Sequence, residues 1–193
     1  GPVSAKGRLE AAGADEGSLR RTLSGDVQIR VGKGVVKEFA VLSKIFSILN
    51  VSQLLRLRLP DMTVDGMPFR SIRASWRLAD GIARTDDLLL RGPAMNIAAQ
   101  GQLDLRRETM DMTVGVQPLQ TIDKVVSRIP VLGWILTDTD RRFLTMTFEA
   151  KGPWRDPVVE AVPVRALALE VLNIFKRVLE LPAKLLTDAG EVF

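Results

Sequence analysis

Residues 95–118 read MNIAAQGQLDLRRETMDMTVGVQP, in which apolar and polar side chains alternate on both sides of a charged turn at residues 106–109. A period of two is typical of strands that have one apolar face and one wet face, as in an antiparallel sheet. The turn is expected to close a hairpin between them. This segment therefore predicts two neighbouring antiparallel strands.

The same alternation recurs along most of the chain, in residues 27–31, 55–59, 72–78 and 144–150. The connectors are short, and several are turn dipeptides, namely Asp65-Gly66, Asp80-Gly81 and Gly92-Pro93. From about residue 54 to residue 117, strand follows strand with no helical segment between them. This order predicts a meander and not a parallel sheet built from βαβ units.

Three segments have helical spacing of their apolar residues, namely residues 36–49, 119–128 and 164–186. Pro182 is expected to kink the last of them, because it removes a backbone donor. We therefore expect an α+β fold, a strongly twisted antiparallel sheet with about three helices, including a long C-terminal amphipathic helix. The expected division is a β-rich domain over residues 1–163 and an appended helix over residues 164–193.

The composition excludes several kinds of functional site. His, Cys and Tyr are absent, so there is no Ser-His-Asp triad, no imidazole ligand and no thiolate zinc site. The acidic pairs Asp86-Asp87 and Asp138/Asp140 lack the ligand spacing of a calcium loop, and we expect them to be solvated loop carboxylates. Enzymes that use only Asp, Glu, Lys or Ser stay open on composition, but we expect no catalytic residue, no metal and no cofactor.

The charge is mildly basic, with a formal net charge of +4. Lys and Arg form no dense run, and the three Trp and seven Phe offer few stacking platforms, so no nucleic-acid partner is expected. No apolar run reaches the roughly 18–20 residues that span a bilayer. Because the chain begins with Gly1-Pro2, a common remnant of tag removal, we expect the natural protein to be longer.

Several motifs occur together in one order: LSKIFSILN (42–50), DGMPF (65–69), LLLRGP (88–93), IPVLGWIL (129–136) and GPWRDPVV (152–159). Their order, more than any one of them, resembles the C-terminal region of AsmA-like proteins of Gram-negative envelopes. The last two motifs are the most distinctive.

The resemblance covers residues 17–163. It implies an elongated β-rich protein that is held in the inner membrane by an N-terminal helix and reaches into the periplasm, where it moves phospholipid towards the outer membrane. The family has no catalytic motif to carry over. We therefore expect a non-catalytic periplasmic domain, part of a longer protein anchored in the inner membrane, with phospholipid or a membrane surface as its partner.

The apolar strand faces are candidates for a lipid groove, because an acyl chain needs a continuous dry surface and no directional contacts. The alternative is that these faces form an ordinary core beneath the helices. The groove candidates are Ile72, Ala74, Trp76, Leu78, Met95, Ile97, Met112, Val114 and Met146.

Two further segments are candidates for membrane contact, an apolar loop after Pro130 and the apolar stripe of the C-terminal helix. Burial of both against the sheet is the alternative. A structural or docking module that contacts another envelope protein or the membrane surface is the alternative function. The contact candidates are Val131, Leu132, Trp134, Ile135, Phe175 and Leu179.

Overall fold

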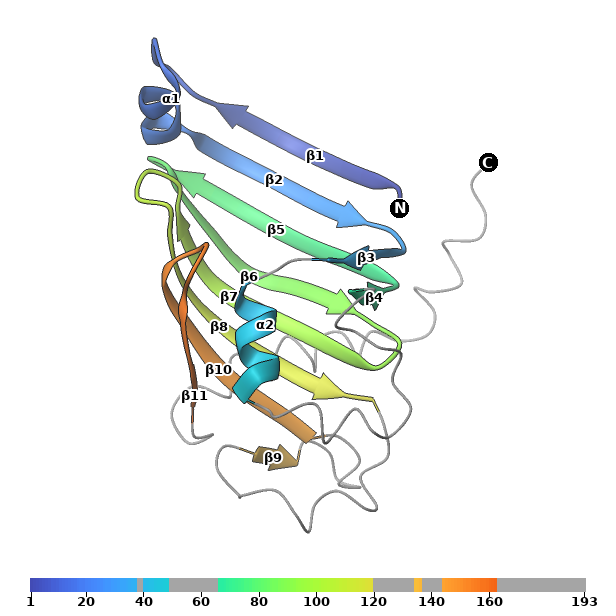
Figure 1. Ribbon diagram of the computed structural model, residues 1–193. Helices are drawn as coiled ribbons and strands as arrows, with labels where there is room; N and C mark the ends of the chain where they lie inside the picture. Colours follow the sequence, from blue (N-terminus) through green and yellow to red (C-terminus); the bar gives the residue numbers. More distant parts are fainter. Residues whose placement is uncertain (38–39, 49–65, 120–133, 137–143, 163–193) are drawn as a thin grey trace, which may run out of the picture.

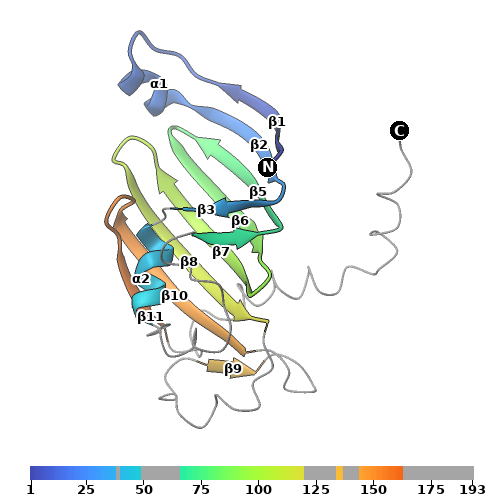
Figure 2. The ribbon, with the colours of Figure 1, turned by 45° about the vertical axis from the view of Figure 1, so that its right-hand side comes forward.

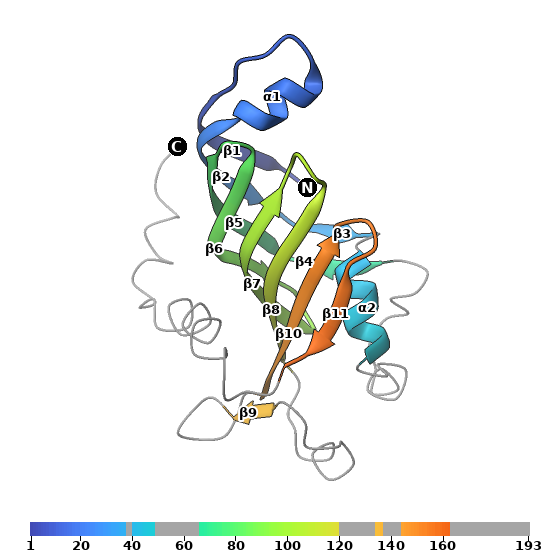
Figure 3. The same ribbon diagram turned by 90° about the vertical axis from the view of Figure 1, so that its left-hand side faces the viewer.

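The computed structural model describes residues 1–37, 40–48, 66–119, 134–136 and 144–162. These residues form mainly one large, strongly twisted antiparallel sheet (Figures 1 and 3). Its nine strands are β1 Val3–Glu10, β2 Ser24–Val31, β5 Ser71–Ala79, β6 Ile82–Arg91, β7 Met95–Asp104, β8 Thr109–Pro118, β9 Trp134–Leu136, β10 Leu144–Pro153 and β11 Val158–Ala161. They lie in the order β1-β2-β5-β6-β7-β8-β10-β11. The short strand β9 pairs with the first three residues of β10.

The hairpin predicted at residues 95–118 is present. β7 and β8 pair antiparallel, from Met95 opposite Pro118 to Asp104 opposite Thr109. The strands predicted around residues 27–31, 72–78 and 144–150 lie within β2, β5 and β10. Residues 55–59 lie outside the described part of the chain. Period-two alternation located these strands because one face of each packs on apolar neighbours and the other is more polar, although Ala98, Gln117 and Thr147 on that other face are also buried.

The turn at Asp80-Gly81 joins β5 and β6 with only two residues. Both have positive φ angles, 48° at Asp80 and 75° at Gly81. This is the geometry of the type I′ turn, whose twist matches that of the strands it joins and which favours Asp-Gly.

The link between β2 and β5 leaves the sheet and crosses one of its faces. It carries β3 (Gly34–Val36), α2 (Ala40–Ile48) and β4 (Met67–Phe69), and β3 pairs with β4 in a separate ladder. Figure 2 shows α2 and the β3–β4 ladder on the same side of the main sheet. β5 then pairs with β2, so strands far apart in sequence become neighbours.

The core lies between this link and the sheet. Val41, Leu42 and Ile45 of α2 are buried, and so are Met67 and Phe69 of β4. They pack with the buried side chains of β6, β7, β8 and β10 in one cluster. The helical spacing of apolar residues in α2 therefore reflects packing on a sheet.

The expected α+β fold with about three helices is wrong. The described residues are mostly strand and contain two helices, α1 (Glu16–Thr22) and α2. The helix expected at residues 36–49 begins only at Ala40, because Val36 pairs with Met67 in the β3–β4 ladder. The helix expected at residues 119–128 lies outside the described residues except for Leu119, which belongs to no helix. The long C-terminal helix expected at residues 164–186 lies wholly outside them.

Helix α1 was not predicted, because it has no buried residue and hence no apolar stripe. The sequence feature that specifies α1 is a short capping motif at its first turn. Asp15 accepts a hydrogen bond from the Ser18 backbone N–H at 2.7 Å, and the Ser18 hydroxyl lies 3.1 Å from the Asp15 N. This capping box satisfies backbone donors at the start of the helix.

Candidate functional site

One face of the main sheet carries an unbroken row of apolar side chains from β1 to β10. Directly paired residues of neighbouring strands share a face. The pairs that form the row are Val3 with Val31, Val31 with Ile72, Ile72 with Leu90, Leu90 with Ile97, Ile97 with Val116 and Val116 with Met146. We call these residues the apolar row and their side of the sheet the apolar face. At about 4.8 Å between strands, the row is roughly 29 Å long.

The structure brings all nine groove candidates onto this apolar face. Each belongs to the row or lies an even number of residues from a row member on the same strand. The pairing of β5 with β2 is continuous from Ile72 to Leu78, so the face is maintained along this part of β5. The candidates are Ile72, Ala74, Trp76, Leu78, Met95, Ile97, Met112, Val114 and Met146.

Exposure falls steadily along the apolar row. Val3 on β1 is 70% exposed, Val31 and Ile72 are half-buried, and Val116 on β8 is 1% exposed. We therefore divide the apolar face into an open part on β1, β2 and β5 and a covered part on β6, β7, β8 and β10.

The groove candidates are distributed over both parts. Trp76, Leu78 and Ile72 on β5 are half-buried, whereas Ala74 between them is buried. The remaining five candidates, Met95, Ile97, Met112, Val114 and Met146, are buried in the cluster beneath α2 and β4. In this arrangement those five pack as core, while β5 borders a partly exposed apolar surface.

Sequence reasoning missed two components of this face. It noted the alternation in β2 but did not identify Val27, Ile29 and Val31 as continuing the face from Trp76, Ala74 and Ile72. It also missed β1, whose Val3 and Leu9 are exposed. The signal in β1 is weak, because Gly7 and Ala5 take the positions of larger apolar residues.

Methionine is concentrated in the buried cluster. Met95, Met110, Met112 and Met146 belong to the covered part of the sheet, and Met67 lies on β4 above it. Met is unbranched and polarizable, so it adapts to irregular neighbours more readily than Leu or Ile. The covered part is thus built from side chains that can repack.

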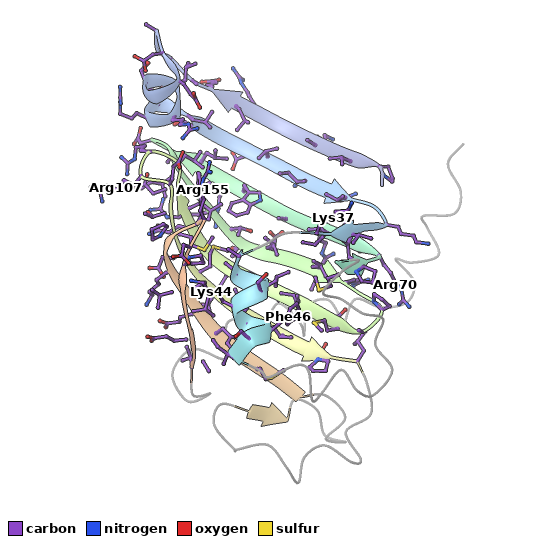
Figure 4. All side chains as sticks on the ribbon, viewed as in Figure 1. Lys37, Lys44, Phe46, Arg70, Arg107 and Arg155 are labelled. Carbon is purple, nitrogen blue, oxygen red and sulfur yellow. The ribbon has the colours of Figure 1, made fainter. Side chains whose placement is uncertain are left out.

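Helix α2 is attached to the far edge of the sheet by a polar clamp. Lys44 Nζ lies 2.5 Å from Asp156 Oδ1 and donates to the Pro157 carbonyl at 2.7 Å. Figure 4 shows Lys44 on α2 with Phe46, which packs against the buried cluster. The apolar side of α2 thus covers the sheet, and its polar side holds the turn between β10 and β11.

The carboxylates of the β7–β8 turn, at the same end of the strands as this clamp, are engaged by arginines. Arg106 donates to Asp104, and this hydrogen bond is the main reason why the pKa of Asp104 falls to about 2. Arg20 of α1 donates to Glu108 at 2.7 Å and lowers the pKa of that carboxyl. Carboxylates held in this way are weak bases at neutral pH, and they fasten α1 to the β7–β8 turn.

Asp86 and Asp87 lie in strand β6 and not in a solvated loop as expected. The pairing of β6 shifts between Thr85 and Leu88, which marks a bulge at these two residues. Asp87 accepts hydrogen bonds from the Ser75 backbone N–H and hydroxyl, at 2.7 and 2.8 Å. Within the described ranges, no group of three or more acidic, His or Cys residues is arranged to hold a metal.

The membrane-contact candidates fall mostly outside the described residues. This applies to Val131, Leu132, Phe175 and Leu179. Trp134 and Ile135 belong to β9, where Trp134 pairs with Met146 at the end of the apolar row. None of the helices described here is both long and apolar enough to cross a membrane.

A family model and a curated protein both relate this chain to proteins named YhdP. Residues 5–159 match the model of a family described as YhdP protein. The chain is also 26% identical, over 157 residues, to the intermembrane phospholipid transporter YhdP of Escherichia coli (strain K12). The matched region is 73% of this chain and only 12% of that transporter. No solved structure matches.

The family match covers most of the chain, including β1 from residue 5 onward and the other strands of the apolar row. It confirms the AsmA-like resemblance that the order of the motifs indicated. The chain belongs to the YhdP protein family.

Proposed function

We propose that this chain is a non-catalytic segment of an envelope protein and that it binds or guides phospholipid on its apolar face. The observation that carries the proposal is the apolar row, which crosses seven strands without a polar interruption and is open at the β1 end. The open part of the row, on β1, β2 and β5, spans roughly 10 Å, so it accommodates part of an acyl chain and leads into the part that α2 and β4 cover.

The driving force is removal of apolar surface from water. Val3 and Leu9 are 70% and 48% exposed, and the apolar side chains of β2 are half-buried. Full burial of one such side chain contributes about 1.5–3 kcal/mol. An acyl chain that covers several of them therefore gains enough to bind without directional contacts.

The cellular setting is part of the same proposal. The E. coli relative is named as an intermembrane phospholipid transporter, and this chain corresponds to a small fraction of its length. We place the segment in the periplasm, within a longer protein anchored in the inner membrane. Lipid passes between the inner and outer membranes, and this segment supplies one part of the apolar path.

The proposal is tested by native mass spectrometry of the chain after incubation with phospholipid vesicles, with lipid extraction of the same sample. Ile29 is half-buried on the open part of the apolar face, and Gln28 beside it is exposed on the other face. Ile29→Glu is expected to reduce bound phospholipid at least about tenfold, because it places a charge where the acyl chain lies. Gln28→Glu introduces the same residue on the same strand and is expected to leave binding unchanged.

Thermal unfolding of both variants separates loss of binding from loss of fold. A wild-type chain that acquires no lipid, or equal losses in the two folded variants, contradicts the proposal. Either result favours the docking module, for which the exposed edge strand β1 and its exposed Val3 and Leu9 are the available surface.

A further inference from the structure

Three arginines meet on the side of the sheet opposite the apolar face, which we call the polar face. Arg30 on β2 is directly paired with Arg73 on β5. Arg73 is paired with Leu89 on β6, so Arg91, two residues further along β6, is its diagonal neighbour. Both spacings are within reach of long side chains, and three positive charges therefore lie on three adjacent strands.

These charges are not neutralised by the described part of the chain. None of the ion pairs found there involves Arg30, Arg73 or Arg91. Burial lowers the pKa of Arg73, and repulsion from Arg91 and Arg30 lowers it further, although its guanidinium stays charged. Like charges in direct cross-strand pairs are destabilising, so this arrangement is under electrostatic strain.

Asp87 is the carboxylate that acts against the lowered pKa of Arg73, but it forms no ion pair with the three arginines, and its oxygens accept hydrogen bonds from Ser75 and Thr85 at the bulge. Two other cations of the polar face have acidic partners: Arg77 lies 3.3 Å from Asp86 and Lys151 lies 2.6 Å from Glu149. Lys6 and Arg84 on this face form no ion pair among the described residues. The end of β2, β5 and β6 is distinct because three arginines without an ion pair lie there on adjacent strands.

Gln117 lies on the same face but outside this cluster. Arg91 is paired with Asn96, and Asn96 with Gln117, so Gln117 is two strands from Arg91 and four strands from Arg30. Gln117 is 1% exposed, its Oε1 accepts from Asn96 Nδ2 at 3.3 Å, and its Nε2 has no hydrogen-bond partner. At about 4.8 Å between strands, a phosphate held by the arginines does not reach it.

We propose that Arg30, Arg73 and Arg91 form a binding site for a phosphate group. All three present donors and together they carry three positive charges, which suits a ligand made of anionic acceptor oxygens. The planar guanidinium fork matches phosphate oxygens bidentately, and a phosphate bridges several arginines better than a single carboxylate does. The phosphate belongs either to a lipid headgroup or to a soluble phosphate.

Isothermal titration of inorganic phosphate into the purified chain, at ionic strength held constant with NaCl, tests the site. Saturable binding is expected. Arg73→Gln and Arg91→Gln are each expected to weaken it at least about tenfold, because each removes a charge-assisted contact. Arg77→Gln is the matched control on the same strand and face, and is expected to change the affinity less than about twofold. Equal weakening in Arg77→Gln, or no phosphate binding beyond that of chloride at the same ionic strength, overturns the proposal.

The source of the phosphate is found by sedimentation with phosphatidylglycerol or phosphatidylcholine vesicles. Binding to phosphatidylglycerol that Arg73→Gln removes and inorganic phosphate competes away identifies a lipid headgroup. Phosphate binding in the titration without vesicle binding identifies a soluble phosphate. Vesicle binding that is indifferent to Arg73→Gln and to phosphate contradicts the site. Ile29→Glu lies on the opposite face and is expected to leave phosphate binding intact, so this site and the acyl-chain proposal fail independently.

Discussion

The carboxylate of Asp104 organises the turn between β7 and β8. It accepts from the Arg106 side chain and from the backbone N–H groups of Arg106 and Arg107. Its pKa in the folded chain is about 2, below the ordinary 3.8. The unfolded chain therefore takes up this proton first as the pH falls. Asp104 stabilises the fold above about pH 4, and this contribution is lost as the pH falls towards 2.

The prediction is that Asp104→Asn flattens the dependence of the unfolding free energy on pH between about 4 and 2, and lowers the unfolding free energy at neutral pH. Urea unfolding at a series of pH values measures both effects. Asp111→Asn, an exposed position on the neighbouring strand, serves as the control. An unchanged slope in Asp104→Asn would show that other carboxylates dominate acid unfolding.

Which side chains share a face was predictable from the sequence, because period two fixes it within each strand. Which side chains meet across strands was not. Arg30, Arg73 and Arg91 are separated by 43 and 18 positions, and only the pairing of β2 with β5 and β5 with β6 brings them together. The unpaired donor of Gln117 likewise follows from packing and leaves no signal in the sequence.

At the scale of elements, α2 covers the apolar face through two separate kinds of contact, the ion pair of Lys44 with Asp156 and the packing of its buried apolar residues. Lys44 is 40% exposed and Asp156 is 83% exposed, so their ion pair is worth no more than about 1 kcal/mol. The buried residues Val41, Leu42 and Ile45 hold the helix on the sheet independently of it.

Lys44→Met is therefore expected to lower the unfolding free energy by less than about 1 kcal/mol while increasing hydrogen exchange of the α2 amides. If α2 limits access to the covered part of the apolar face, the same variant takes up more phospholipid. Lys37→Met, an exposed lysine shown in Figure 4, is the control. A loss of several kcal/mol, or unchanged exchange in α2, would contradict the description of α2 as a separable cover.

The sequence located most strands but misjudged the helices, and the reasons differ. α1 lacks an apolar stripe and is specified by the Asp15–Ser18 capping box, so periodicity could not detect it. The start of α2 was placed too early, because Val36 continues the apolar spacing yet is taken by pairing with Met67. Local periodicity cannot reveal the early pairing of Val36, since its partner Met67 lies about thirty residues away.

At the scale of the molecule, the sheet separates two chemistries. The apolar row runs across one face from β1 to β10, and the arginine cluster lies on the other face at the same end of the strands. Exposure along the row decreases from Val3 to Val116, so the sheet presents an open apolar surface that leads into a covered, methionine-rich one. This gradient is what the proposed lipid path requires.

The most direct test of this account is site-specific photocrosslinking to a phospholipid that carries a photoreactive acyl chain. Irradiation attaches the lipid to the residues that it contacts. Mass spectrometry then maps the adducts to individual residues. Adducts at Val27, Ile29 and Trp76 on the open part of the apolar face, and none at Gln28 or Arg77 on the polar face of the same strands, are the predicted result. Adducts spread equally over both faces, or confined to the polar face, would contradict the claim that the apolar face holds the acyl chain.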